Sequence, residues 1–375
     1  MTRPAAEAVV DLDAYRHNLE VLGALAAGAQ SMAVVKADGY GHGAVACARA
    51  ARAAGVPWLG VATLEEAFAL RAAGDRGRLL TWLAPDGADF AAAVANDIDV
   101  TAASVDQLDE IVAAPARERA RVHLKVDTGM SRNGAYGADW DALCAAAARA
   151  HHAGRVEVVG VFSHFACADD PEHPSVASQE RRFVSAVDQL RDAGVEPELR
   201  HLANSAATLT RPSSHLDLVR LGIASYGLTP APRVGSSADF GLRPAMTLRA
   251  RLALVKRVPA GAGVSYGHTY VTDRETTLGL VPVGYGDGVL RGLSNRAQVW
   301  AAGARRTIAG RVCMDQLMID LGDADVARGE SVTLFGSGDV GEPTAQDWAE
   351  AADTISYEIV TRLGNRIHRT YVGSQ

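Results

Sequence analysis

Short apolar runs alternate with longer alanine-rich stretches from about residue 30 to residue 230. The apolar runs are rich in Val, Ile and Leu and have the length of buried strands. We expect eight strands, at residues 31–37, 57–63, 78–84, 98–104, 121–127, 156–165, 197–203 and 216–222. Helical stretches lie between them, including residues 64–74, 106–114, 139–154 and 180–194. Eight strands, each followed by a helix or helical turn, predict a parallel sheet closed into an α/β barrel of the (β/α)8 type.

The pattern changes after about residue 240, where apolar runs are separated by turns that contain Gly and Asp. These runs predict strands at residues 246–258, 276–286, 297–303, 305–312, 315–322 and 330–338. Two short helices and a last strand are expected within residues 347–372. We therefore divide the chain into a barrel over residues 1–235 and a mainly β domain over residues 236–375. The early strand at residues 6–13 is expected to pair with the β domain.

Composition narrows the class of protein. The net charge is −7 with both signs scattered along the chain, so no basic block indicates nucleic acid or an anionic membrane surface as a partner. No signal-like segment and no apolar run of membrane-spanning length is found, which predicts a cytoplasmic protein. The four cysteines show neither paired nor metal-ligand spacing, so we expect reduced thiols and no metal site.

Polar residues gather where the predicted barrel strands end. Barrel enzymes place their active sites at the carboxyl ends of the strands, because the loops from all strands meet there. The strand-end residues are Lys36, Lys125, Asp127, Arg132, His164, Asn204, Ser205 and Arg220. A packed core alone does not require so many charges and amides on one rim.

Lys36 is the most unusual of these residues, because it follows the buried run Met32 to Val35 directly. Loss of hydration at a strand end lowers the pKa of a lysine and favours imine formation with a carbonyl. The loop at residues 220–227, "RLGIASYG", can direct backbone N–H groups at a phosphate. Together they indicate a phosphorylated cofactor whose carbonyl forms a Schiff base with Lys36.

These residues resemble the alanine racemases, pyridoxal 5'-phosphate enzymes of the barrel type. The stretch "AVVKADGYGHG" matches the cofactor-lysine motif of that family. Further matching stretches are "VHLKVDTGMSR", "SHFACAD", "ANSAA", "RLGIASYGL", "VSYGHTY", "VPVGYGDG" and "GRVCMDQLMID". The resemblance extends over nearly the whole chain, and its first and last motifs are the most specific.

The resemblance implies roles for individual residues. Lys36 and Tyr266 would act as bases on opposite faces of the substrate, since inversion at Cα needs one group to remove a proton and another to return it. Arg220 would face the pyridine nitrogen and leave it unprotonated, because arginine keeps its proton. Arg132 and the Met314 backbone N–H would hold the substrate carboxylate. The other cofactor contacts would be Tyr40, His164, Ser205, Gly222, Ile223 and Tyr357.

Supporting residues also follow from the resemblance. Lys125 is expected to be carbamylated and to orient Arg132. The pocket would be narrowed to fit a small substrate side chain by Tyr285, Cys313, Met314 and Asp315. Asn204 would be a further supporting residue. The family arrangement brings Tyr266 and Met314 into the active site of a second protomer, so a homodimer with shared active sites is expected. The implied activity is interconversion of L- and D-alanine, which supplies D-alanine for peptidoglycan in the cell wall.

Three other functions are compatible with parts of the pattern. A racemase of broader range would act on serine and other small amino acids. A barrel-type amino-acid decarboxylase is disfavoured by Arg220, since a carboxylate would be expected at that position. A non-catalytic barrel protein that binds pyridoxal phosphate would lack the β domain of residues 236–375.

Overall fold

The structure is a computed structural model that describes residues 4–373. The chain divides into two compact units. One unit contains Arg16–Gly39 and Ala44–Leu242 and is called the barrel unit here. The other, the β unit, contains residues 4–15, Tyr40–Gly43 and residues 243–373. The short insertion Tyr40–Gly43 therefore belongs to the β unit, although it lies between two segments of the barrel unit.

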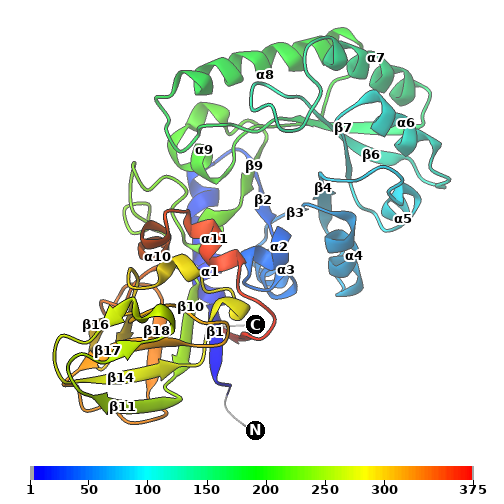
Figure 1. The fold of residues 1–375 in the computed structure, drawn as a ribbon. Coiled ribbons are helices and arrows are strands. Elements are labelled where there is room, and N and C mark those ends of the chain that lie inside the picture. The colour runs from blue at the N-terminus through cyan, green and yellow to red at the C-terminus, as the bar shows by residue number, and fades with distance from the viewer. Residues whose placement is uncertain (1–3, 374–375) are drawn as a thin grey trace. The chain divides into compact units, whose positions relative to one another are not determined.

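The barrel unit contains eight parallel strands (Figure 1). They are β2 (Gln30–Val34), β3 (Trp58–Val61), β4 (Arg78–Thr81), β5 (Val100–Ala102), β6 (Ala120–Lys125), β7 (Val156–Phe162), β8 (Leu199–His201) and β9 (Leu218–Leu221). They pair in the orders β4-β3-β2-β9 and β5-β6-β7-β8. A parallel bridge between Leu80 and Asp99 joins β4 to β5. On the other side, the Arg220 N–H donates to the Ala203 carbonyl at 3.1 Å. The predicted (β/α)8 barrel is confirmed.

One helix precedes these strands and the others connect them. They are α1 (Leu12–Leu25), α2 (Lys36–Tyr40), α3 (Ala44–Ala53), α4 (Leu64–Ala72), α5 (Phe90–Ala95), α6 (Val105–Ala113), α7 (Ala138–His152), α8 (Pro174–Asp192) and α9 (Ser205–Thr210), with 3-10 turns η1 (Pro212–Ser214) and η2 (Ile223–Tyr226). Helix α4 begins with a capping box in which Thr63 and Glu66 bond each other's backbone N–H groups. Gly154 follows α7 with a φ of 69°, a conformation that favours glycine after a helix.

The β unit is built on three sheets. Its strands are β1 (Ala6–Asp11), β10 (Met246–Arg251), β11 (Leu254–Val258), β12 (Gly263–Val264), β13 (Tyr270–Val271), β14 (Thr276–Val281), β15 (Gln298–Ala301), β16 (Ala304–Thr307), β17 (Leu317–Gly322), β18 (Ser331–Phe335) and β19 (His368–Val372). The largest sheet has the order β16-β15-β18-β10-β1-β19, and the others are β11-β14-β17 and β12-β13. Strand β1 pairs antiparallel with β10 and parallel with β19.

The remaining elements of the β unit are short. They are the helices α10 (Ala345–Ala352) and α11 (Ser356–Thr361) and the 3-10 turns η3 (Tyr266–His268), η4 (Tyr285–Asp287) and η5 (Arg291–Leu293). The run predicted as one strand at residues 246–258 is two strands, so that expectation was wrong. The chain changes sheets between them, because the Leu252 N–H bonds Glu330 at 2.9 Å and the Ala253 N–H bonds Leu280 at 2.9 Å.

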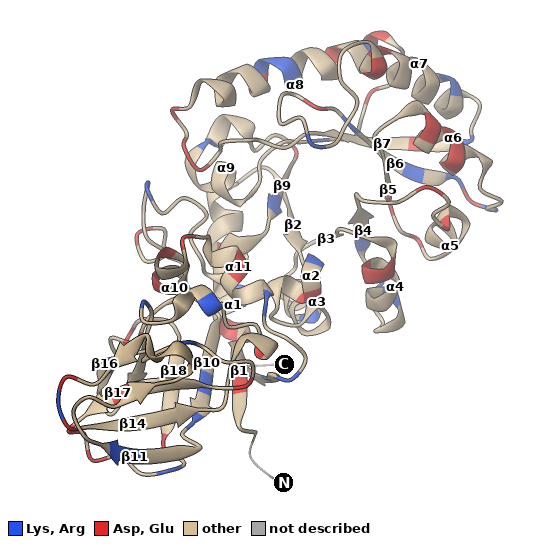
Figure 2. Cartoon of the chain, in the orientation of Figure 1, with Lys and Arg blue, Asp and Glu red and all other residues tan. Residues whose placement is uncertain are grey.

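Charged side chains of both signs are distributed over both units (Figure 2). Within residues 4–373, each helix is too short or too polar to cross a bilayer. Cys47, Cys144, Cys167 and Cys313 are all free thiols.

Candidate functional site

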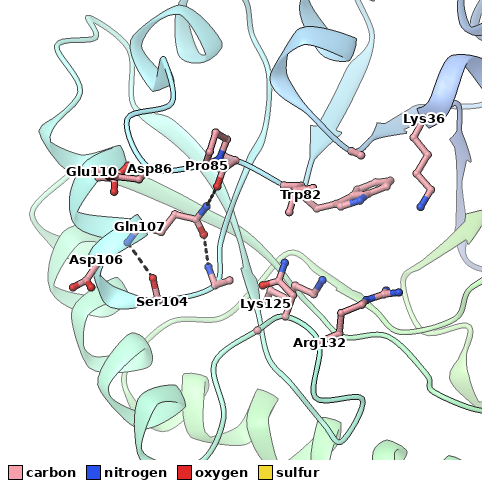
Figure 3. A pocket seen from close by; sticks show the side chains of 16 residues that line it. Lys36, Trp82, Pro85, Asp86, Ser104, Asp106, Gln107, Glu110, Lys125 and Arg132 are labelled. Atoms are coloured by element: carbon pink, nitrogen blue, oxygen red, sulfur yellow. Dashed lines mark hydrogen bonds between the residues drawn. The ribbon is translucent and has the colours of Figure 1, made fainter.

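A pocket of about 880 Å³ opens in the barrel unit among the strand ends. Figure 3 shows Lys36, Trp82, Lys125 and Arg132 directed toward one part of this space. Asp86, Asp106 and Glu110 lie at the other end of the pocket. The volume lies in the range typical of small-molecule sites.

Lys36 does not lie in the strand that precedes it, which corrects the predicted strand end. Strand β2 stops at Val34, and Lys36 begins the turn α2, in which Ala37, Asp38 and Gly39 all have positive φ. This left-handed conformation is costly for residues other than glycine. Two carboxylates hold it: Glu66 accepts the Ala37 N–H at 2.6 Å, and Asp38 accepts the Ala44 N–H at 2.9 Å. The Lys36 side chain thereby leaves the chain at a sharp, fixed turn.

The pocket disfavours the protonated form of both of its lysines, Lys36 and Lys125. Burial, followed by the charge of Arg132, lowers the pKa of Lys36. Burial, together with the charges of Arg220 and Arg132, lowers the pKa of Lys125 to about 8. Lys36 Nζ lies 6.0 Å from the centre of the Trp82 ring, and Lys125 Nζ lies 5.3 Å from that of Phe162. Cations are thus concentrated in one partly desolvated space.

Arg220 is held rigidly inside the barrel unit. One terminal nitrogen, Nη1, donates to the His201 carbonyl at 2.9 Å and lies 3.3 Å from His201 Nδ1. The other, Nη2, donates to the carbonyls of Ser163 at 2.7 Å and Leu202 at 3.1 Å and lies 3.2 Å from His164 Nδ1. Among residues 4–373, the hydrogen bonds that Arg220 donates from its side chain all come from Nη1 and Nη2, and its Nε–H has no acceptor.

Buried electrostatics keep the neighbouring imidazole of His164 neutral. Burial and the positive charges of Arg220, Arg132 and Lys125 place the pKa of His164 well below its usual value. Burial also lowers the pKa of Arg220 to about 10, so this guanidinium remains charged at neutral pH.

The glycine-containing loop after β9 is fastened to the loop after β8. Ser205 Oγ accepts the N–H of Gly222 at 2.8 Å and that of Ala224 at 3.3 Å. Asn204 is the N-cap of α9 and accepts the Ala207 N–H at 3.0 Å. The turn η2 begins at Ile223. The first N–H groups of a helical turn have no acceptor within the turn, so they can donate to a bound group. Gly222, which was expected to donate to a phosphate, already bonds Ser205.

The other predicted residues lie in the β unit, where the structure gathers them in two places. The rings of Tyr40 and Tyr357 lie side by side with centres 6.2 Å apart. Three other side chains are exposed: Tyr266 by 71%, Met314 by 55% and Tyr285 by 41%. Exposed aromatic and methionine side chains of this size are typical of surfaces that meet a ligand or partner.

Backbone bonds join the loops that carry these exposed residues. The Tyr285 N–H donates to the Cys313 carbonyl at 3.0 Å, and the Gly286 N–H donates to that of Met314 at 2.8 Å. Ser265, next to Tyr266, lies 3.3 Å from Cys313 Sγ. A side chain at Gly284 would overlap the Cys313 carbonyl, so this close approach requires glycine. Asp315 pairs with Arg366 at 2.7 Å.

Sequence reasoning missed two residues of the Lys36 environment. Trp82 follows β4, and its place in an apolar run gave no sign that it lines a pocket. Glu66 was hidden in an ordinary capping pattern, Thr-x-x-Glu, which also serves the Lys36 turn. Within residues 4–373, no cluster of three His, Cys, Asp or Glu side chains is placed to bind a metal ion.

Known proteins resemble this chain over its whole length. Residues 10–230 match the family model "Alanine racemase, N-terminal domain", and residues 245–371 match "Alanine racemase, C-terminal domain". An alanine racemase of Frankia casuarinae is 58% identical over 97% of this chain and 96% of its own length. One of Thermobifida fusca is 56% identical over 98% of each chain.

Solved structures that resemble this chain are also alanine racemases. The crystal structure of alanine racemase from D-cycloserine-producing Streptomyces lavendulae superposes with a TM-score of 0.98 and 53% identity, covering 100% of this chain and 99% of that one. That of Bacillus anthracis with bound L-Ala-P gives a TM-score of 0.91 at 34% identity, covering 100% and 96%. This chain belongs to the alanine racemase family.

Proposed function

We propose that this protein interconverts L- and D-alanine with pyridoxal 5'-phosphate as its cofactor, and that Lys36 and Tyr266 transfer the protons. The observation that carries the proposal is the group of cations formed by Lys36, Lys125, Arg132 and Arg220, in which the pKa of each lysine is lowered. Positive charges brought this close repel one another unless an anion joins them. A phosphorylated cofactor and an amino-acid carboxylate are suitable anions.

The residues present fit that cofactor. The unpaired Nε–H of Arg220 suits an acceptor such as a pyridine nitrogen, and the desolvated amine of Lys36 suits a carbonyl carbon. The phosphate would be held by Ser205, Ile223, Tyr40 and Tyr357, while the Gly222 N–H, bonded to Ser205 Oγ, would hold Ser205 in place. Bound pyridoxal phosphate supplies an electron sink for the bond broken at Cα.

Arg220 would favour racemisation over side reactions at Cα. Its guanidinium can only donate a hydrogen bond, so the ring nitrogen would have to accept and would therefore carry no proton. This makes the sink weaker, which favours rapid return of a proton to Cα over slower side reactions. His164, whose pKa is lowered by burial and by its cationic neighbours, would add no further charge to the cofactor.

Proton transfer requires groups on both faces of Cα. Lys36 would hold the cofactor covalently and then move a proton on one face, helped by its lowered pKa. Tyr266 would serve the other face. Arg132 and the Met314 N–H would bind the substrate carboxylate, while Tyr285, Cys313 and Asp315 limit the side chain to a small one.

Lys125 would act on Arg132. A lysine with a pKa of about 8 is partly neutral and nucleophilic near neutral pH, which favours carbamylation. The resulting anion beside Arg132 would replace repulsion by attraction and orient the guanidinium. Asn204, which caps α9, supports Ser205 from the neighbouring position.

The direct test is chiral analysis of the amino acid after incubation. Purified protein loaded with pyridoxal phosphate should convert L-alanine to an equal mixture of enantiomers, since enantiomers have the same free energy. L-Serine in a parallel reaction should be converted much more slowly. Release of carbon dioxide without D-alanine, or no change in either amino acid, would contradict the proposal.

We also propose a cytoplasmic homodimer in which each active site combines Lys36 of one protomer with Tyr266 of the other. The exposure of Tyr266, Tyr285 and Met314 supports this, because a single chain leaves these large side chains uncovered. Mixed dimers test it. Lys36→Ala and Tyr266→Phe proteins, dissociated together and reassociated, should regain about a quarter of the wild-type sites, since half of the dimers are mixed and each has one intact site.

Each variant reassociated alone is the control and should remain inactive. If Lys36 and Tyr266 of the same chain formed a site, every site in the mixture would carry one defect. Activity would then not recover on mixing, and the shared-site arrangement would be wrong.

A further inference from the structure

A line of polar side chains crosses the interior of the barrel unit and ends at Arg220. We call Asp99, His123, His201 and Arg220 the polar column. Asp99 Oδ2 lies 3.3 Å from His123 Nε2, and His123 Nδ1 lies 3.0 Å from His201 Nε2. The column then continues to Arg220 Nη1, 3.3 Å from His201 Nδ1. Asp99, His123 and His201 are completely buried.

The column starts at the amino-terminal end of the strands. Asp99 immediately precedes β5, and two arginines pair with it: Arg78, the first residue of β4, and Arg121, the second residue of β6, each at 2.6 Å. Burial acts to raise the pKa of Asp99, but hydrogen bonds from His123 and Arg78 outweigh it and hold the pKa below its usual value. Asp99 is therefore an acceptor only.

The two ends of the column determine where the histidine protons lie. Arg220 can only donate, so His201 Nδ1 must accept and His201 must carry its proton on Nε2. That proton is donated to His123 Nδ1, which leaves the His123 proton on Nε2, facing Asp99. A second proton on His123 would force His201 to present N–H to the N–H of Arg220. The geometry thus selects two neutral rings with one tautomer each.

The barrel is shaped to admit these rings. A Cβ at Gly160 would overlap His123 Nδ1, so the strand beside His123 needs a glycine there. The pairing of β6 with β7 shifts register between Val122 and His123. Phe162 stacks on His201 with ring centres 4.7 Å apart. Barrel interiors are usually filled with Val, Ile and Leu, which would avoid the cost of burying polar groups.

We propose that Asp99 and His123 are positioning residues for Arg220. They hold His201 in the tautomer that accepts from Nη1, so the four Nη hydrogens of Arg220 remain bound and its Nε–H is left for the cofactor. The other tautomer would set an N–H against Nη1 and turn the guanidinium. The proposal rests on the assignment of Arg220 as the partner of the cofactor ring, made above.

The first test measures the protonation state and tautomer of the His123 and His201 rings directly. In the holoenzyme with 15N-labelled histidine, NMR should show His123 and His201 as neutral rings protonated on Nε2, with His123→Gln and His201→Gln used for assignment. A proton on His201 Nδ1, or a doubly protonated His123, would overturn the proposal. This readout does not depend on turnover, so it remains decisive even if the protein proves to racemise no alanine.

The second test compares two buried carboxylates. Asp99→Asn, whose amide can face His123 with either a donor or an acceptor, should lower kcat about 10-fold with little change in KM, the lower end of the cost of removing an outer hydrogen-bond partner. Asp75→Asn is the matched control: Asp75 is 8% exposed and pairs with Arg52 and Arg71, outside the column. It should lower Tm but leave kcat unchanged.

Equal losses of kcat in the two variants, or an unchanged kcat in Asp99→Asn, would overturn the proposal, because the effect would then be one of general stability or absent. If Asp99→Asn does not fold, the wild-type tautomers alone decide.

Discussion

Lys36→Ala is expected to remove racemisation in both directions and the visible absorbance of the bound cofactor. The chain has only three lysines, Lys36, Lys125 and Lys256, so few amines can compete for the cofactor carbonyl. Lys36 alone follows a buried strand at a turn held by two carboxylates, where burial lowers its pKa. In the proposed mechanism its side chain would supply both the covalent attachment and one of the two proton-transfer groups, so no residual route is expected.

The measurement is chiral analysis together with an absorbance spectrum of the loaded protein. Borohydride reduction of the wild-type protein and peptide mapping should place the cofactor on Lys36 and not on Lys125. Lys256→Ala is the control, since Lys256 is exposed in β11, and it should match the wild type. Normal turnover by Lys36→Ala would end the pyridoxal hypothesis.

Tyr266→Phe is expected to slow racemisation steeply in both directions but to affect proton exchange unequally. Loss of a positioned acid or base typically lowers a rate by ~10²–10⁴-fold. In the proposed mechanism, Tyr266 would take the Cα proton of L-alanine and Lys36 would take that of D-alanine. In heavy water, D-alanine should therefore still exchange its Cα proton through Lys36 without inversion, while L-alanine exchanges far more slowly. NMR of the recovered amino acids measures both rates.

Tyr270→Phe provides a matched control from the same segment. Its hydroxyl donates to Asp320 at 2.6 Å, so its loss should lower the stability of the β unit. The Cα exchange rates of L-alanine and of D-alanine should both stay at their wild-type values. If Tyr266→Phe instead slows exchange equally for both enantiomers, Tyr266 is not the second base, and the two-base assignment has to be abandoned.

The local pattern of apolar and polar residues was sufficient to predict the eight barrel strands. Each of the eight is a short apolar run between alanine-rich helices, and burial on both faces makes such a run recognisable without knowledge of its neighbours. The Lys36 motif was also readable, because a lysine directly after four apolar residues conflicts with burial. The sheet change at Leu252 and Ala253 was not readable, since the run looks continuous and only its partners, Glu330 and Leu280, divide it.

The polar column depended on the tertiary structure. His123 and His201 lie on separate strands and Asp99 lies just before a third. In the sequence, each alone resembles an ordinary polar residue beside apolar ones. Their roles come from distances across the barrel and from the donor-only and acceptor-only groups at its ends. Glu66 is similar, because its capping pattern was visible but its bond to Ala37 was not. Residue type and spacing determine which strands and turns form, whereas the direction of a hydrogen bond and the pKa of a buried lysine depend on neighbours that only folding brings together.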